Sequence, residues 1–218
     1  MDQEFNKKII LVGYSGHAYV IADSLTNINR EILGYSDVKK TKSNPYNLNY
    51  LGFESGKDFK FLNNKFDFFV SIGDNKLRVL ISKYLRSKLQ TLTNVIDQAS
   101  SISKNIKLGT GIFIARNVSI NTLCEIENDV IINTSATIDH ECIIKSGAHV
   151  APGAVLLGNV NVGKNSFIGS NSIIKEGVKI GDDVIVGAGS VVLKDVKNNS
   201  IIYGNPAKLK LWIKKLLL

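Results

Sequence analysis

The sequence contains few cysteines, few histidines and no candidate membrane span. Its apolar run Ile9–Val12 has the sequence IILV, whereas a helix needs about 20 apolar residues to cross a bilayer. The preceding residues 1–8 are polar and charged, so they lack the pattern of a secretory signal. We therefore expect a cytoplasmic protein that is not stably inserted in a membrane.

Clusters of basic residues interleaved with aromatic residues are also missing, which argues against nucleic acid as a partner. The net charge is nevertheless +8 at pH 7. Such a charge suits polyanionic ligands, although a composition rich in Lys, Asn and Ile explains it at least as well. With 218 residues and 44% hydrophobic content, the chain has the size and composition of one or two soluble domains.

The sequence does contain a six-residue repeat. From Ile102 to Val192, every sixth residue is Ile, Leu or Val without exception. A second series, four residues after each of these, runs from Ile106 to Val196 and holds only Ile, Val, Ala, Cys or Ser. Neither the period of a helix nor that of a simple strand gives this pattern. A coil that turns a corner every six residues does, so the 16 hexads predict a little over five coils of a parallel β-solenoid, with 18 residues per coil.

The two cysteines, Cys124 and Cys142, lie 18 residues apart in the second series. This spacing predicts that they stack on successive coils as buried thiols. A disulfide is geometrically conceivable but is not expected in the cytoplasm. Thiols committed to the core also argue against a cysteine nucleophile.

The first part of the chain has a different pattern. The predicted elements are, in order, a strand at 9–12, a helix at 18–29, a strand at 32–35, a short edge strand at 50–52, a strand at 66–72, a helix at 77–89 and a strand at 92–96. The glycine turn 13–17 and Asp37, about twenty residues later, suit a Rossmann-like nucleotide site, although the turn alone is also explained as a tight turn. Roughly 97 residues are too few for a complete dinucleotide fold, so we do not predict a nicotinamide enzyme.

The six-residue repeat resembles that of the hexapeptide-repeat acyltransferases, whose fold is a left-handed parallel β-helix. The left hand is implied by the resemblance alone. The order of the motifs GYSGH, GYSD and SIGDN with Arg78, all ahead of the repeat, resembles the bacterial sugar O- and N-acetyltransferases of the sialic acid O-acetyltransferase type. This resemblance implies a Rossmann-like nucleotide-sugar domain at 1–97, a β-helix acyltransferase domain at 98–208 and a helical cap at 209–218.

Members of this family acetylate the 4-amino group of nucleotide-linked amino-dideoxy sugars, which are used for surface glycans and protein glycosylation. The resemblance therefore implies acetyl-CoA as co-substrate, no metal, and a nucleotide-linked sugar as partner. By it, five residues hold the nucleotide sugar: Ser15, Gly16, His17, Asp37 and Gly73. The family often has a second acidic residue after Asp37, and here that position is Val38, which leaves the base of the nucleotide open.

The chain has only three histidines, and His140 lies in the densest polar segment of the repeat. A histidine beside a carboxylate suits a general base, although a lone histidine in a solenoid is usually a solvated turn residue. The segment DHEC matches the catalytic turn of the family, which implies that His140 is the base and that Glu141 supports it. Asn133 matches another polar residue of that site. We expect direct attack by the acceptor, without a covalent intermediate.

The resemblance also implies a set of residues that hold the acetyl donor. They are His149, Gly158, Ser170, Gly187, Ala188 and Lys208. Turn formation alone would equally explain the glycines. The family forms homotrimers with active sites between subunits, and we expect the outward residues Phe113 and Phe167 to supply apolar contacts there.

Three other functions remain open from the sequence. One is O-acetylation of a free or nucleotide-linked sugar. Another is a non-catalytic module that binds a nucleotide sugar. Zinc-dependent hydration, which also occurs on this fold, is poorly supported, because it needs three histidine ligands at suitable spacing and His17 belongs to the other domain.

Overall fold

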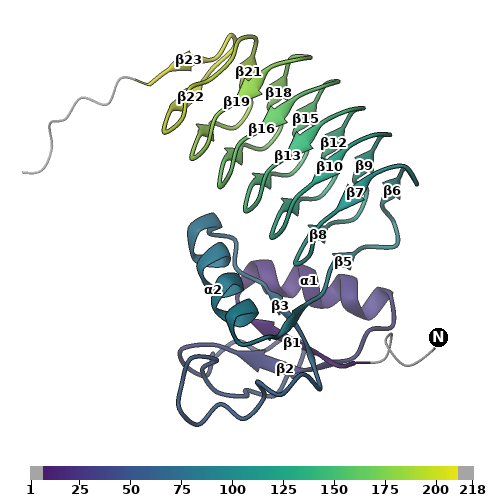
Figure 1. The fold of residues 1–218 in the computed structure, drawn as a ribbon, viewed down its shortest axis with the longest axis vertical. Helices are drawn as coiled ribbons and strands as arrows, with labels where there is room; N and C mark the ends of the chain where they lie inside the picture. Colours follow the sequence, from purple (N-terminus) through teal and green to yellow (C-terminus); the bar gives the residue numbers. More distant parts are fainter. Residues whose placement is uncertain (1–6, 211–218) are drawn as a thin grey trace, which may run out of the picture.

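A computed structural model describes residues 7–210. The chain forms a small α/β domain followed by a parallel β-solenoid (Figure 1). The predicted fold class, a Rossmann-like βαβ domain followed by a left-handed parallel β-helix, is confirmed. In the part of the chain that the structure describes, neither helix has the length and apolar composition of a membrane span.

The first domain is a parallel sheet with helices on both faces. Its strands lie in the order β2 (Ile32–Ser36), β1 (Ile9–Val12), β3 (Asp67–Val70) and β4 (Thr91–Leu92), and its helices are α1 (Gly16–Asn27) and α2 (Asn75–Ser87). Every residue of β1 is buried, which is why its sequence is continuously apolar.

Alternate residues of β1 face two separate hydrophobic clusters, as the two-residue period of a strand requires. Ile9 and Leu11 pack in one cluster with α1 and the solenoid. Ile10 and Val12 pack in the other, which includes Leu85 of α2. The sheet is therefore covered on both sides, and α1 lies between it and the solenoid.

The solenoid has three faces, each formed by one sheet. The strands pair in parallel, except that the last two strands of face 1 run antiparallel. Face 1 contains β5 (Val95–Ile96), β8 (Phe113–Ile114), β11 (Ile131–Ile132), β14 (His149–Val150), β17 (Phe167–Ile168), β20 (Ile185–Val186), β22 (Ile201–Tyr203) and β23 (Lys208–Leu209). Face 2 contains β6 (Ser101–Ile102), β9 (Ser119–Ile120), β12 (Thr137–Ile138), β15 (Val155–Leu156), β18 (Ile173–Ile174) and β21 (Val191–Val192). Face 3 contains β7 (Lys107–Leu108), β10 (Glu125–Ile126), β13 (Ile143–Ile144), β16 (Asn161–Val162) and β19 (Lys179–Ile180).

Successive coils pair 18 residues apart, as Ile126 does with Ile144. In the central coils, the aliphatic residue that ends each strand points inward, and Ile138, Ile144 and Val150 are each 0% exposed. We call the three edges corner 1–2, corner 2–3 and corner 3–1, after the faces that they join. At each corner of the central coils one residue adopts a positive φ, as Glu141 (59°) and Gly147 (72°) do. Asn, Asp and Gly fill most of these positions because they tolerate that conformation.

The predicted strand 92–96 is divided in the structure. Leu92 ends β4 of the first domain, whereas β5 pairs with β8 as the first rung of face 1. Asn94 turns the chain between them, since its side chain donates to the Gly109 carbonyl (2.9 Å) and accepts from the Ile112 amide (2.9 Å). The solenoid therefore starts one hexad before Ile102.

The prediction for Phe113 is wrong. Its side chain points out of face 1, but it is 0% exposed because the first domain covers it. The ring lies 6.4 Å from that of Phe69 and 5.6 Å from that of His17, centroid to centroid. Phe113 thus joins the two domains and is not free to contact another subunit.

Of the predicted cap at 209–218, only residues 209 and 210 are described. Leu209 lies in β23, which pairs antiparallel with β22. Residues 211–218 lie outside the described part of the chain, so the helix predicted there stays a prediction. The two cysteines are free and buried, as predicted.

Candidate active site

His140 lies at corner 2–3 with one side of its ring held by Glu141. Its Nδ1 is 3.0 Å from Glu141 Oε2, so Nδ1 carries the proton and donates it to the carboxylate. The Nε2 lone pair is then left free for a substrate proton. The hydrogen bond to Glu141 raises the pKa of His140, and the negative charges of Asp139 and Glu176 add to this.

Asp139 fixes the backbone of the same turn. Its Oδ1 accepts from the His140 amide (2.8 Å) and from Asn121 Nδ2 (2.7 Å). These hydrogen bonds lower the pKa of Asp139, so the carboxylate remains charged near neutral pH. Asp139 therefore orients the turn, while Glu141 orients the ring.

Gly158 lies next to the His140 ring, one coil further along. A Cβ at Gly158 would lie 2.6 Å from both Cε1 and Nε2 of His140. The missing side chain therefore leaves space beside the nitrogen that would act as base. This is a close approach that only glycine permits, and the 18-residue spacing of the repeat is the signal that links the two positions.

A second polar group lies where face 1 meets corner 1–2. Asn133 Nδ2 is 3.2 Å from His149 Nε2, and Asn133 Oδ1 accepts from the Thr134 amide (2.8 Å). The second bond fixes which end of the amide faces the ring, so Nε2 of His149 accepts and Nδ1 carries the proton. Burial lowers the pKa of His149 to about 3, helped by the positive charge of Arg78 and by His17. His149 is thus neutral at physiological pH.

His17 lies beside His149 at the junction of the two domains. Their ring centroids are 6.2 Å apart. Burial, with a contribution from Arg78, lowers the pKa of His17 to about 4. His17 Nε2 and His149 Nδ1 are both buried, and neither has a hydrogen-bond partner in the part of the chain that the structure describes. Two neutral imidazoles therefore present polar atoms that a bound ligand or an ordered water would satisfy.

The other residues predicted to hold the nucleotide sugar lie on the turns above the sheet of the first domain. A Cβ at Gly16, the first residue of α1, or at Gly73 would meet nothing within 4 Å among the described residues, so the backbone is accessible to a ligand at both positions. Ser15 precedes α1, and its side chain makes no capping hydrogen bond. Gly73 lines a cavity of about 300 Å³ between the start of α2 and face 1.

Asp37 lines a separate, largely apolar cavity of about 420 Å³, together with Gly13 and Ile72. Its Oδ2 accepts from the Tyr14 amide (3.0 Å). This bond links the end of β2 to the glycine turn that follows β1. Strand ends at the switch point of a parallel sheet are where such folds bind nucleotides.

The residues predicted to hold the acetyl donor are spread along the solenoid. Ser170 and Ala188 lie at corner 1–2 on successive coils, 18 residues apart. A Cβ at Gly187 would lie 2.8 Å from the Cβ of Tyr203, so packing of the last segment also explains this glycine. Lys208 lines a cavity of about 460 Å³ at the end of the solenoid.

Within one chain these residues form two groups. His140, Glu141 and Gly158 lie at corner 2–3, whereas His149 lies on face 1 and Asn133, Ser170 and Ala188 lie at corner 1–2. The structure therefore brings the predicted base close to Gly158 but not to the other group. Among residues 7–210, no three His, Cys, Asp or Glu side chains gather as metal ligands.

A three-faced β-solenoid built from six-residue repeats and preceded by a small nucleotide-type domain is the architecture of the hexapeptide-repeat acyltransferases. Residues 8–85 match the family described as the PglD N-terminal domain, and residues 159–194 match the hexapeptide repeat of succinyl-transferase. The chain belongs to the bacterial hexapeptide-repeat sugar acetyltransferases.

Two solved structures show how far the similarity extends. A mutant of perosamine N-acetyltransferase from Caulobacter crescentus, in complex with CoA and GDP-perosamine, is 31% identical, with a TM-score of 0.87 over 93% of this chain and 96% of that chain. The acetyltransferase domain of PglB from Neisseria gonorrhoeae FA1090, solved with acetyl coenzyme A, is 26% identical, with a TM-score of 0.85 over 94% of this chain and 100% of that chain. Both domains are therefore shared with these proteins.

Proposed function

We propose that this protein transfers the acetyl group of acetyl-CoA to the amino group of a nucleotide-activated amino-dideoxy sugar. The observation that carries the proposal is the His140–Glu141 pair, whose free Nε2 faces the space beside Gly158. The similarity to a perosamine N-acetyltransferase that binds CoA and GDP-perosamine supports both substrates.

The proposed chemistry needs only this chain's side chains and the two substrates. The amine nitrogen attacks the thioester carbonyl, and His140 Nε2 removes the proton as the C–N bond forms. The C–S bond then breaks, and the imidazolium returns the proton to the departing thiolate. No covalent enzyme intermediate is required, and both thiols of the chain are buried.

We infer that the complete site forms between subunits of a homotrimer. Support comes from the separation of the two groups of residues: corner 2–3 of one subunit would meet face 1 and corner 1–2 of the next. Symmetric association of this kind gives three equivalent sites. We further propose that the product serves surface-glycan or glycoprotein biosynthesis and that the reaction takes place in the cytoplasm, where acetyl-CoA and nucleotide sugars are made.

Release of coenzyme A is the test of this proposal. The protein is incubated with acetyl-CoA and a panel of uridine, thymidine and guanosine diphosphate amino sugars, and products are identified by mass spectrometry. We expect one sugar to gain an acetyl group that withstands mild alkali, as an amide does. We expect His140→Ala to lower kcat by about 10²–10⁴-fold, the usual contribution of a general base. Wild-type rates in this variant would remove His140 as the base.

Two outcomes would favour other functions. An acetyl group lost under mild alkali would indicate an ester and therefore O-acetylation. Tight binding of a nucleotide sugar with no release of coenzyme A from any member of the panel would indicate a non-catalytic binding module.

A further inference from the structure

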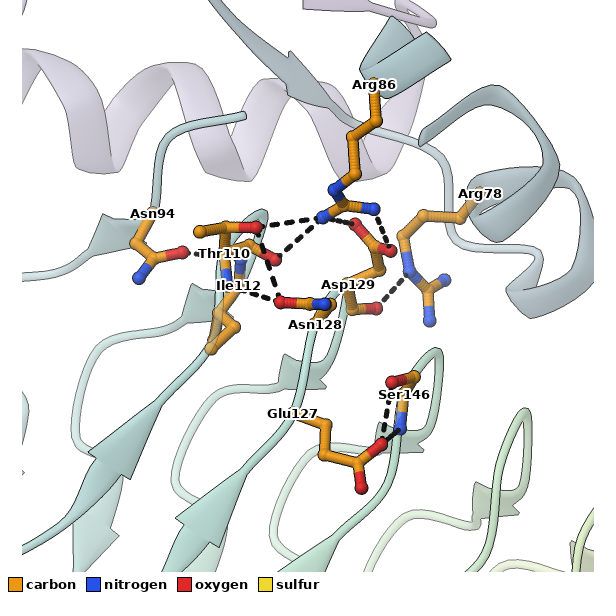
Figure 2. A network of polar contacts seen from close by, with 9 residues as sticks. All are labelled: Arg78, Arg86, Asn94, Thr110, Ile112, Glu127, Asn128, Asp129 and Ser146. Carbon is orange, nitrogen blue, oxygen red and sulfur yellow. Dashed lines mark hydrogen bonds and ion pairs between the residues drawn. The ribbon is translucent and has the colours of Figure 1, made fainter. Parts of the chain in front are cut away.

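Arg78 is a buried cation that contacts both domains (Figure 2). It lies on α2 and is 1% exposed. Its Nη1 donates to the carbonyls of Ile72 and Gly73, both at 3.1 Å. On the solenoid side, Nη2 donates to the Gly147 carbonyl (2.8 Å) and Nε donates to the Asp129 carbonyl (2.9 Å).

Arg78 is almost fully buried, and no carboxylate of residues 7–210 forms an ion pair with it. Burial lowers its pKa to about 10, against the opposing effect of Asp129 and Asp74. Removing a charge from water is costly unless its donors are all satisfied. Here backbone carbonyls and Asn75 Oδ1 (2.9 Å) satisfy them. The planar guanidinium thus fixes several backbone positions relative to one another.

The two backbone segments that Arg78 joins are the ones that carry the predicted binding residues. Gly73 is the open turn predicted to contact the nucleotide sugar. Gly147 and Ala148 directly precede His149 in β14, and Arg78 Nη2 also reaches the Ala148 carbonyl (3.4 Å). The Gly73 backbone also interacts with His149. This interaction raises the pKa of His149 and so partly offsets the lowering caused by burial.

We propose that Arg78 is a positioning residue that holds the Gly73 turn and the His149 rung at a fixed spacing for acetyl transfer. This inference rests on the proposed function, because it assigns Gly73 to the acceptor site and His149 to the donor site. Misplacement of reacting groups by about 1 Å can cost on the order of 10²-fold in rate.

Arg86 provides a matched control on the same helix. It joins α2 to the same residue of the solenoid, through a bidentate pair with the Asp129 carboxylate (2.7 and 2.9 Å). It also donates to Thr110, and none of its hydrogen bonds involves Gly73 or Gly147. Figure 2 shows Arg86 at the Asp129 carboxylate and Arg78 at the Asp129 backbone carbonyl. Arg86 therefore joins the domains without touching the predicted site.

The test compares Arg78→Lys with Arg86→Lys for Tm, kcat and the two KM values. A lysine keeps the charge but loses the planar fork. We expect both variants to melt at lower temperature. Only Arg78→Lys should also raise KM for the nucleotide sugar and lower kcat, by on the order of 10²-fold in kcat/KM. Kinetic constants that change equally in the two variants would overturn the proposal.

If Arg78→Lys does not fold, Asn75→Ala is the variant that tests the same proposal. Asn75 accepts from Arg78 and donates to the Asn165 carbonyl (2.9 Å), so its loss loosens the guanidinium without removing it. A smaller rise in the same KM supports the proposal, and an unchanged KM contradicts it. Wild-type protein that turns over no nucleotide sugar would refute the proposed function, whereas active wild type with normal Arg78 variants would refute this inference alone.

Discussion

The hydrogen bond between His140 and Glu141 sets the pH at which the proposed base is neutral. A base acts in its unprotonated form, so the rate falls as pH drops through the pKa of His140. Glu141 raises that pKa, which moves the acid limb of the profile to higher pH. In Glu141→Gln we expect the acid limb of kcat/KM to move to lower pH, with a lower plateau because the ring is less firmly oriented.

Steady-state rates measured across pH check this prediction. Glu125→Gln is the control, because Glu125 is an exposed carboxylate that pairs with Lys107 on face 3. An acid limb that does not move in Glu141→Gln would show that the carboxylate does not set the pKa of the catalytic group.

The close approach of Gly158 to the His140 ring predicts what a methyl group added at Gly158 would do. Its φ is outside the left-handed region, so alanine adds no backbone strain there. The added methyl group would, however, lie 2.6 Å from His140 Nε2, and the ring has to move. We expect Gly158→Ala to lower kcat by on the order of 10²-fold, as small misplacements do, while Tm changes little because the His140 side chain is 46% exposed. Unchanged kcat would mean that substrates approach from another side.

At the scale of elements, α2 is joined to corner 3–1 by an ion pair that is partly buried. The Arg86 and Asp129 side chains are 30% and 5% exposed. Asp129→Asn keeps a residue that tolerates the positive φ of 59° but removes the charge. We expect the free energy of unfolding to fall by about 1.5–3 kcal/mol, the usual value of a hydrogen bond to a charged group.

Urea unfolding measures this loss. The Lys107–Glu125 pair is the control, since its side chains are 82% and 46% exposed and such pairs contribute about 0–1 kcal/mol. Equal losses in Asp129→Asn and Glu125→Gln would show that the domain junction contributes no more than an exposed pair.

The sequence predicted the elements wherever local chemistry decides them. Residues such as Ile138 and Ile144 recur every sixth position because the inside of each rung has to be aliphatic. Contacts between domains were not predictable in this way. Arg78 meets Gly147, 69 residues away, and Phe113 is covered by a helix near the start of the chain. No period in the sequence records such contacts.

The candidate site was predicted in part for the same reason. The 18-residue repeat places Gly158 next to His140, and this follows from spacing alone. The tautomer of His149 depends on Asn133, which is 16 residues away, and on an amide orientation that only three-dimensional contacts reveal. The roles of these residues in catalysis remain predictions.

For the whole molecule, the separation of His140 from Asn133 predicts complementation between inactive variants. If each site combines corner 2–3 of one subunit with corner 1–2 of the next, His140→Ala and Asn133→Ala chains can form intact sites together. Refolding an equal mixture should restore about a quarter of wild-type activity, assuming random assembly of a cyclic trimer.

Each variant refolded alone is the control, and coenzyme A release is the measurement. A mixture no more active than the average of its two components would show that all catalytic groups come from one chain.

The pairing of β5 with β8 also matters for anyone who wishes to build chimeras between relatives of different sugar preference. In a chimera joined after residue 97, β5 would come from one protein and β8 from the other, so the first strand pair of the solenoid would be mismatched. Joining at residues 93–94, between β4 and β5, exchanges the whole first domain and leaves the recipient's solenoid with its own first strand.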